Sequence, residues 1–319
     1  MRVLFFGTGD FAFPFVKSLF ATQDLIGVVT QPDRQSGRGM KKVYSALKQW
    51  VLENGLQLYQ PESIKDDLFR ETMQSLAPDL IIVASYGKLL PPWLLSLPRF
   101  GCINVHASLL PGLRGAAPIQ RALLNGCKKT GVAIMLMDSG MDTGDIILQE
   151  EVCISEDMTA GELSEVLIAK GLDLLTQVLG ALELSLQERI AQNHSLATSA
   201  PMIKKADEEI HWDKSGQEIH NQIRALNPQP GAFTYYNDRL IKIWKSIMPN
   251  SEIEQATRNN RMPGTILNPS HPQGILILCG SDAIVVQELQ PMGKNKMNAR
   301  QFVQGYRIKE GSVFGRSQN

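Results

Sequence analysis

The chain has 319 residues, of which 43% are hydrophobic and 20% charged, and its formal net charge is zero. This length allows two domains with separate cores, and the composition is that of ordinary globular proteins. A neutral chain has no global field that would favour nucleic acid or a membrane surface. The N-terminal apolar run is too short for a signal peptide, and no run is long enough to cross a membrane. We therefore expect a cytoplasmic protein with no membrane partner.

The first half of the chain alternates apolar runs with amphipathic segments. Such runs are typical of parallel strands that helices cover on both faces. We expect strands at 3–6, 25–29, 80–84, 103–106, 132–137 and 146–148. We expect helices near 11–20, 43–54, 63–76, 116–125 and 159–187, the last opened by a capping box of Thr159 and Glu162. This order predicts an α/β fold with a doubly wound, mostly parallel sheet, which binds ligands at the carboxyl ends of its strands.

The pattern fades between residues 190 and 208, which we interpret as a linker. One helical segment near 216–226 follows, and then strand signals at 232–236, 240–247, 265–267, 275–279 and 283–288. Several short strands in close succession predict a small β-barrel of the OB-like kind. We expect a catalytic domain over 1–189 and a barrel domain over 209–319. From Lys205 onward the chain has 14 basic and 11 acidic residues, a net charge of +3.

A polar pair marks the end of the strand expected at 103–106. Asn104 and His106 are two residues apart, so on a strand their side chains leave the same face. Pro and Gly residues follow at once and indicate a shaped loop. Asp142 lies in a Gly-rich turn after the strand at 132–137, so the two strand ends can bring an amide, an imidazole and a carboxylate together. Each of the three also has a purely structural interpretation, but together they favour acyl-transfer chemistry.

A second group of residues is basic. Arg34, Arg38, Lys41 and Lys42 lie within twelve residues that contain one acid, Asp33. This composition fits either a solvated loop or a loop that contacts phosphates.

Two further ligand classes are not expected. The Gly7 to Ala12 turn resembles a dinucleotide fingerprint, but that site needs an acid at the end of the second strand, and the first acid here is Asp33, in the loop beyond. We therefore interpret this stretch as a tight turn and expect no NAD. The four cysteines stand apart, without a Cys-x-x-Cys pair or a Cys/His cluster, so we expect neither disulfides nor a metal site.

The residues from Asn104 to Pro111 and from Arg114 to Gln120 resemble the signature of the folate-dependent formyltransferases, and Asp138 to Asp145 resembles that family's second motif. The resemblance extends over nearly the whole chain to members that formylate a charged tRNA. It includes their tRNA-contacting insertion, at 31–34 and 37–39, and the opening of their C-terminal domain, at 210–212 and 224–231. The chain departs from the usual family pattern at Gly9 and at Gly112-Leu113.

The resemblance implies a set of roles. Asn104, His106 and Asp142 would be catalytic; Ser108, Leu109, Leu110 and Pro111 would lie against 10-formyltetrahydrofolate; and Arg34, Arg38, Lys41 and Lys42 would contact tRNA. The acceptor would be initiator methionyl-tRNA, and no metal would take part. We expect the protein to act as a monomer.

Three alternatives remain open. A formyl-folate hydrolase, or a formyltransferase acting on a small nucleotide-linked amine, would have less reason to carry the basic insertion. An RNA-binding module without catalysis would leave the convergence of Asn104, His106 and Asp142 unexplained. An NAD-dependent oxidoreductase would lack the ribose-binding acid.

Overall fold

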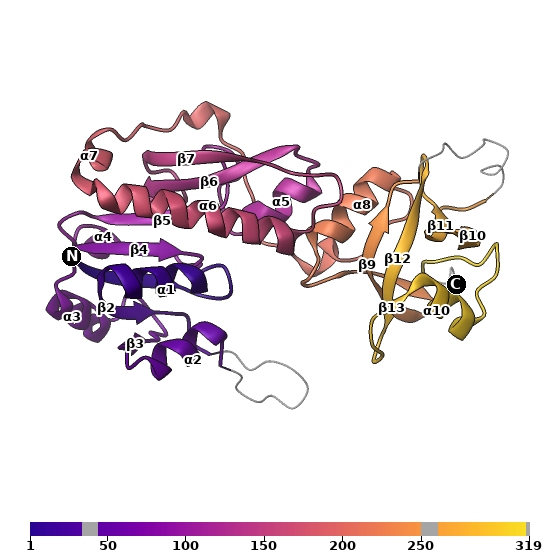
Figure 1. Ribbon diagram of the computed structural model, residues 1–319, viewed down its shortest axis with the longest axis horizontal. Helices are drawn as coiled ribbons and strands as arrows, with labels where there is room; N and C mark the ends of the chain where they lie inside the picture. The colour runs from indigo at the N-terminus through magenta and orange to yellow at the C-terminus, as the bar shows by residue number, and fades with distance from the viewer. Residues whose placement is uncertain (34–43, 250–260, 317–319) are drawn as a thin grey trace. The chain divides into compact units, whose positions relative to one another are not determined.

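The computed structural model describes residues 1–33, 44–249 and 261–316 (Figure 1). Its contacts divide the chain into two compact units. Unit 1 comprises Met1–Pro118, Lys129–Cys153 and Ser164–Pro201, and unit 2 comprises Ile119–Lys128, Ile154–Leu163 and Met202–Asn319. Among the helices described, none is long and apolar enough to cross a membrane. The four basic residues of the expected tRNA loop lie outside the described residues.

Unit 1 is built on a seven-stranded sheet with the order β3-β2-β1-β4-β5-β6-β7. Its strands are β1 Arg2–Gly7, β2 Asp24–Val29, β3 Leu58–Tyr59, β4 Leu80–Ala84, β5 Cys102–His106, β6 Lys129–Leu136 and β7 Ile146–Cys153. The first five are parallel, and β6 and β7 are antiparallel to their neighbours. The mostly parallel α/β sheet is therefore confirmed.

Helices cover both faces of this sheet. They are α1 Phe13–Thr22, α2 Ala46–Glu53, α3 Asp67–Leu76, α4 Pro92–Leu95, α6 Ala160–Gly180 and α7 Leu182–Gln187, whereas α5 Pro118–Leu124 belongs to unit 2 from Ile119 onward. On one face, α6 contacts α1 and β5 at Gly171, and α2 packs against α1 through Trp50. On the other face, α3 and α4 bury Phe69, Met73 and Leu94 against β1 and β4. The helix expected over 159–187 is interrupted at Ala181, whose backbone is not helical.

The start of the chain forms the tight turn that we expect, since a side chain at Gly7 would overlap Phe5 and Ala12. Asp33 is paired with Lys48, with 2.5 Å between the carboxylate oxygen and Nζ. The first acid after β2 is thus engaged in an ion pair within the protein.

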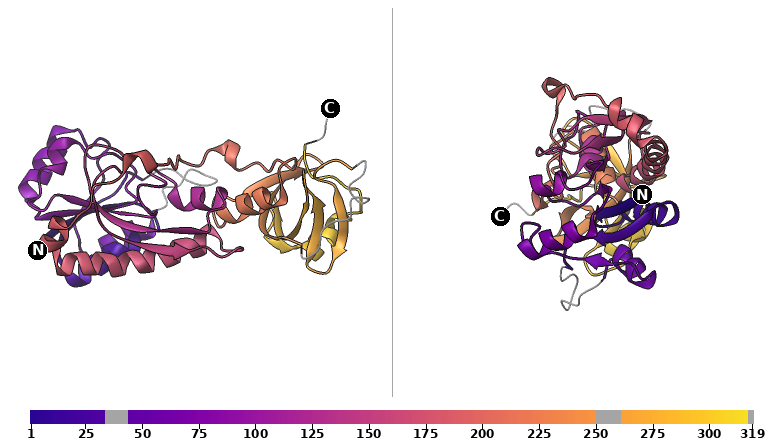
Figure 2. Two further views of the ribbon diagram at one scale, coloured as in Figure 1. Left: turned by 90° about the horizontal axis from the view of Figure 1, so that it is seen from above. Right: turned by 90° about the vertical axis from the view of Figure 1, so that its left-hand side faces the viewer.

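Unit 2 contains a six-stranded antiparallel sheet that curls around its own core (Figure 2). Its strands are β8 Ala232–Tyr236, β9 Arg239–Ile247, β10 Ile266–His271, β11 Gly274–Leu278, β12 Ala283–Pro291 and β13 Met297–Asn298. Asn237 and Asp238 both have positive φ, as the turns favoured in two-residue hairpins require. The helices are α8 Gly216–Ala225 and α10 Ala299–Tyr306, with short 3-10 turns at His194–Leu196 (in unit 1) and Lys205–Asp207.

The two outer strands of this sheet, β8 and β10, are not paired with each other in the part of the chain described. The segment after α10 lies between them instead. Gly311 and Phe314 donate backbone hydrogen bonds to Ile266 and Gly264, and Gly315 donates one to Tyr235 of β8. The segment after α10, which is neither helix nor strand, therefore closes the gap between the outer strands of the expected barrel. A sequence pattern of hydrophobic periodicity cannot reveal such a segment.

Candidate active site

Asn104 and His106 lie on the interior strand β5, which pairs with β4 on one side and with β6 on the other. Their side chains leave the same face of the sheet, as predicted from their spacing. Asn104 is 8% exposed and His106 is 5% exposed. Both side chains are thus held by a strand that is paired on both sides, and each keeps a small exposed fraction.

The loop after β5 folds over this face. Leu110 packs against Ala133 and Met135 of β6, and the buried Ser108 donates a hydrogen bond to the carbonyl oxygen of Gly112. Leu113 has a φ of 58°. Its carbonyl oxygen lies 3.1 Å from His106 Nε2. Because a carbonyl only accepts, this contact requires the proton on Nε2.

Asp142 faces the other nitrogen of the same ring. Its Oδ1 lies 3.6 Å from His106 Nδ1, and its Oδ2 accepts a 2.8 Å hydrogen bond from the backbone N–H of Gly115. The imidazole therefore stands between a carbonyl and a carboxylate. The ring is thus oriented by the carbonyl at one nitrogen and faces the carboxylate with the other.

Asp142 reaches His106 by a different route from the one expected. Because β6 is antiparallel to β5, its last residue, Leu136, pairs with Ile103, at the start of β5. The expected meeting of two strand ends is therefore wrong. The turn after β6 doubles back across the face of the sheet, and Asp138 braces it by accepting hydrogen bonds from Gly140 N–H and Thr143 Oγ1. An apolar run indicates a strand but not its direction.

The carboxamide of Asn104 makes no hydrogen bond with the residues that the structure describes. A buried amide usually has a partner, so an uncommitted one beside a histidine is available to a substrate. Its N–H₂ group can donate to an oxygen that gains negative charge, as an oxyanion-hole donor does.

The four residues expected to bind folate differ in their exposure to solvent. Ser108 and Leu110 are buried and make the contacts given above, whereas Leu109 and Pro111 are half-buried. Any ligand at this loop would therefore meet Leu109, Pro111 and backbone groups before it met the other two side chains. Within the described part of the chain, no group of three or more His, Cys, Asp or Glu residues is placed to hold a metal ion.

Sequence reasoning missed the segment after α7. Residues 190–201, expected to be part of a linker, belong to unit 1. Ile190 exchanges two backbone hydrogen bonds with Ile146, and the backbone of Arg114 is bonded to Thr198 and Ala200. The segment thus packs on both loops of the site. The fully buried Ala200 comes from a stretch without strand or helix periodicity, so no local pattern identifies it.

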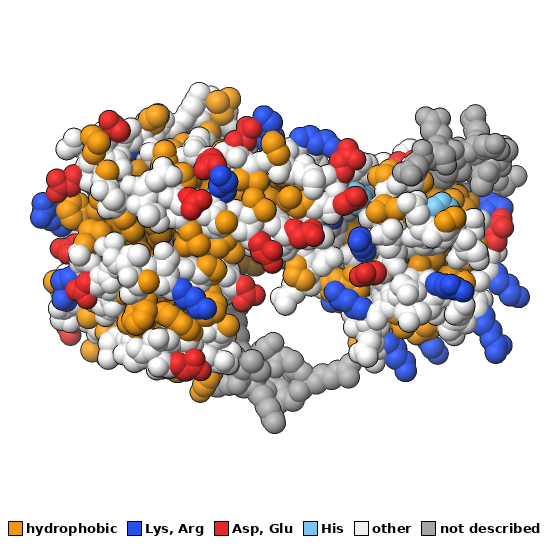
Figure 3. All heavy atoms as spheres, viewed as in Figure 1, with side chains coloured by type: hydrophobic (Ala, Val, Ile, Leu, Met, Phe, Trp, Pro, Cys, Tyr) orange, Lys and Arg blue, Asp and Glu red, His pale blue; other side chains and the backbone are white. Residues whose placement is uncertain are grey.

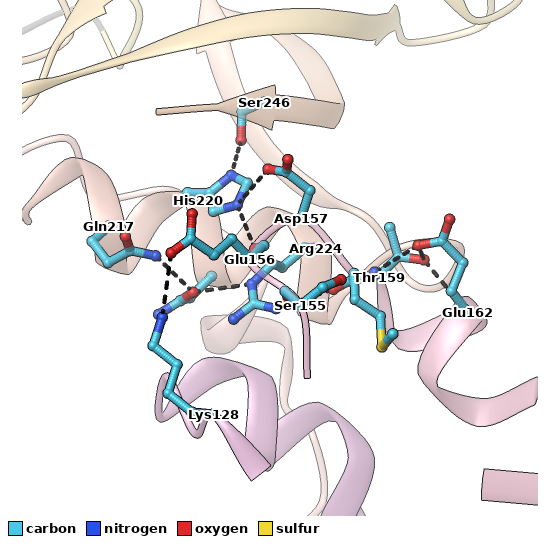
Figure 4. Close-up of polar contacts among 12 residues, drawn as sticks. Lys128, Ser155, Glu156, Asp157, Thr159, Glu162, Gln217, His220, Arg224 and Ser246 are labelled. Carbon is cyan, nitrogen blue, oxygen red and sulfur yellow. Dashed lines mark hydrogen bonds and ion pairs between the residues drawn. The ribbon is translucent and has the colours of Figure 1, made fainter. Parts of the chain in front are cut away.

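A second polar cluster lies within unit 2 (Figure 4). His220 of α8 is 3% exposed; its Nδ1 lies 3.0 Å from Ser246 Oγ, and its Nε2 lies 3.1 Å from the carbonyl oxygen of Glu156 and 3.4 Å from Asp157. This row of hydroxyl, imidazole and carboxylate resembles a nucleophilic triad. However, Ser246 is buried on β9, where it pairs with Val286 of β12, and the contacts of the cluster are all between protein groups. The cluster instead ties α8 to the segment 154–163, together with Arg224, which donates to the carbonyls of Ser155 and Met158.

This cluster makes stability depend on pH. Burial lowers the pKa of His220, an effect strengthened by Arg224 and opposed by the Glu156 carbonyl and Asp157. An unfolded histidine has a pKa of about 6.5, so below that pH the unfolded chain takes up a proton that the native chain refuses. The free energy of unfolding should therefore fall as the pH drops through about 6.5, until the native pKa is reached.

The test is urea unfolding at pH 7.5, 6.5 and 5.5, with wild type, His220→Gln and the exposed His211→Gln. We expect His220→Gln to lose part of the acid sensitivity and His211→Gln to keep it. Equal pH dependence in all three proteins would show that His220 does not carry the effect.

Comparisons with known proteins show the family of the chain. A family model described as formyl transferase matches residues 1–179, and one described as formyl transferase, C-terminal domain, matches residues 202–307. A methionyl-tRNA formyltransferase of Acetivibrio thermocellus is 41% identical over 316 residues, which are 99% of this chain and 100% of that protein. A second, from Carboxydothermus hydrogenoformans, is 43% identical over 314 residues, which are 98% of this chain and 99% of that protein.

Two solved structures share the fold. HypX from Aquifex aeolicus, in complex with tetrahydrofolic acid, has a TM-score of 0.63 at 13% identity; the match covers all of this chain and 51% of that one. The sugar 3N-formyl transferase WlaRD, in the presence of dTDP and 5-N-formyl-THF, has a TM-score of 0.62 at 19% identity and covers 92% of this chain and 99% of that one. At these identities the likeness concerns the fold alone.

Proposed function

This chain belongs to the formyl transferase family, and we propose that it transfers the formyl group of 10-formyltetrahydrofolate to the α-amino group of initiator methionyl-tRNA. Formylation of methionyl-tRNA follows from relatives that are more than 40% identical over almost the whole chain. The observation that supports the chemistry is the trio on one face of the sheet, in which the free amide of Asn104 neighbours an imidazole that faces Asp142 at 3.6 Å.

The proposed reaction needs three things from the protein. The amine attacks the formyl carbon, a carbon–nitrogen bond forms, and the carbonyl oxygen becomes an oxyanion. Asn104 donates a hydrogen bond to that oxygen. The bond to N10 of the folate then breaks, while the amine loses a proton and N10 gains one. His106 carries this proton, and Asp142 orients the ring and stabilises its charged form.

Folate binding rests on the loop after β5. We assign contact with the folate to Ser108, Leu109, Leu110 and Pro111, and support for this comes from the packing of Leu110 on β6, which fixes the loop beside His106. Since both loops of the site and the segment that packs on them come from one chain, a monomer would suffice. A charged tRNA as the acceptor would place the reaction in the cytoplasm.

The acceptor would be held mainly by its phosphates. Figure 3 shows Lys and Arg side chains along one side of unit 2. In the same unit, Lys242 and Lys296 both lie against the ring of Trp244, with Lys296 Nζ 3.8 Å from the ring centroid. Positive charge of this kind gives binding that does not depend on sequence.

The assay of this proposal measures labelled formyl from 10-formyltetrahydrofolate. Charged initiator methionyl-tRNA is the acceptor, charged elongator methionyl-tRNA is the control for initiator choice, and a nucleotide-linked amino sugar and water test the two rival acceptors. Transfer to the initiator tRNA above all other acceptors is expected. Release of free formate, or transfer to the amino sugar alone, would refute the proposed acceptor.

The basic residues at 34–43 allow a separate prediction. If Arg34, Arg38, Lys41 and Lys42 contact tRNA phosphates, the triple change of Arg38, Lys41 and Lys42 to Ala should weaken tRNA binding. It should also reduce the slope of log affinity against log salt by up to about 2.7, because each lost phosphate contact releases about 0.9 fewer counterions. Folate affinity and the melting temperature should stay unchanged.

The measurement is a salt titration of tRNA binding by wild type and the triple variant. Lys65→Ala, at an exposed position of unit 1, serves as a control for a general loss of charge. If the triple variant shows the wild-type slope and affinity, these residues do not contact tRNA.

A further inference from the structure

Gln192 is buried in unit 1, only 6% exposed, within the segment that follows α7. Its Nε2 donates hydrogen bonds to the carbonyl oxygens of Asp142, at 3.0 Å, and of Gly144, at 2.6 Å. Its Oε1 accepts from Arg114, at 3.1 Å from Nε and 2.6 Å from Nη2. Both donors and both acceptor positions of this carboxamide are therefore in use. One side chain joins the turn that carries Asp142 to the loop that follows β5.

The turn needs such a partner. Asp142 has a φ of 53°, a left-handed conformation that is unfavourable for most residues with a side chain. Gly144 is closely enclosed, since a side chain there would overlap the carbonyl of Leu136. Without Gln192, the buried carbonyl of Gly144 and the partly buried carbonyl of Asp142 would both lose their donor, which is itself costly. Gln192 thus stabilises a conformation that the turn would not hold alone.

The hydrogen bonds between Gln192 and Arg114 help to set the position of the Asp142 carboxylate. Arg114 precedes Gly115, whose N–H binds Asp142 Oδ2. Gln192 therefore holds both sides of the hydrogen bond that places this carboxylate in front of His106. If Gln192 were removed, the turn and the loop could move apart while the sheet stayed intact.

We propose that Gln192 is a positioning residue for formyl transfer, acting through Asp142 and Arg114. This inference rests on the function proposed above. Its hydrogen bonds engage protein groups only, so its loss should slow the chemical step and not substrate binding. A displacement of about 1 Å can cost about a hundredfold in rate. We expect a decrease of 10- to 100-fold in the single-turnover rate.

Two substitutions separate positioning from folding. Gln192→Met keeps the length of the side chain and removes all four hydrogen bonds. Gln192→Glu keeps an acceptor for Arg114 but has no N–H for the two carbonyls. We expect both variants to lose rate with KM for charged tRNA and folate affinity within a few-fold of wild type, and both to have a lower melting temperature because the two carbonyls lose their donor. The matched control is Ser195→Ala, in the same segment, whose hydroxyl donates a hydrogen bond to the nearby Asn193 and to no other side chain among the residues described.

A second measurement does not depend on activity. Hydrogen exchange of the amides at 138–145, without substrates, should be faster in both Gln192 variants and unchanged in Ser195→Ala. A wild type that formylates no tRNA would refute the proposed function, while the exchange would still report on the turn. The inference is overturned if Gln192→Glu exchanges and reacts like wild type, or if its loss of rate comes entirely from weaker substrate binding.

Discussion

Replacing Asn104 with Ala should lower the single-turnover rate of formyl transfer by about 10²- to 10³-fold. The loss corresponds to one oxyanion donor, which typically supplies about 3–4 kcal/mol of barrier reduction. Stability should change little, because the Asn104 carboxamide makes no hydrogen bond that the substitution could break within the described residues. An amide that only bridged a loop would show the reverse pattern, with a lower melting temperature and a nearly normal rate.

Asn104→Asp is the matched control for size. It keeps the shape of the side chain but replaces the N–H₂ donor by a second oxygen, so it should be at least as slow as Asn104→Ala. Rapid-quench measurement of labelled transfer gives the rates, and the melting temperature and folate affinity of each variant exclude misfolding. If the Ala variant were within a few-fold of wild type, Asn104 would have no part in stabilising the oxyanion.

Local patterns in the sequence were enough to place most of the elements. The strand at 232–236 is found with its expected limits, and β5 differs by one residue. The capping box of α6 forms as predicted, because Thr159 and Glu162 are neighbours along the chain, and their reciprocal bonds lower the pKa of Glu162. The spacing of Asn104 and His106 fixed their common face for the same reason. In each case the decisive interaction lies within a few residues.

Other features depend on contacts between distant residues. The direction of β6 is not encoded in its apolar run, and the route of Asp142 to His106 follows from that direction. Gln192 and Arg114 are separated by 78 residues, and nothing in their local sequence links them. The helix α10 is a different case, since Asn298 and Gln301 form a capping box that the sequence could have shown.

The charge of Asp142 should matter more than its shape. Asn tolerates the left-handed backbone of this position as well as Asp does, and its side-chain oxygen can still accept from the N–H of Gly115. Asp142→Asn should therefore keep the turn, the melting temperature and folate affinity close to wild type. It removes the negative charge that faces His106 Nδ1 at 3.6 Å. If that charge orients and stabilises the imidazolium, the single-turnover rate should drop by at least about a hundredfold.

Asp142→Ala provides the comparison that separates these roles. It removes the charge and the hydrogen bond to Gly115 together, and Ala is poorly suited to a φ of 53°. It should therefore be both slow and less stable, whereas Asp142→Asn should be slow alone. The two variants should be equally slow if charge dominates, because both lack the carboxylate. A rate for Asp142→Asn within a few-fold of wild type, with Asp142→Ala destabilised, would mean that Asp142 only shapes the turn and that His106 works without it.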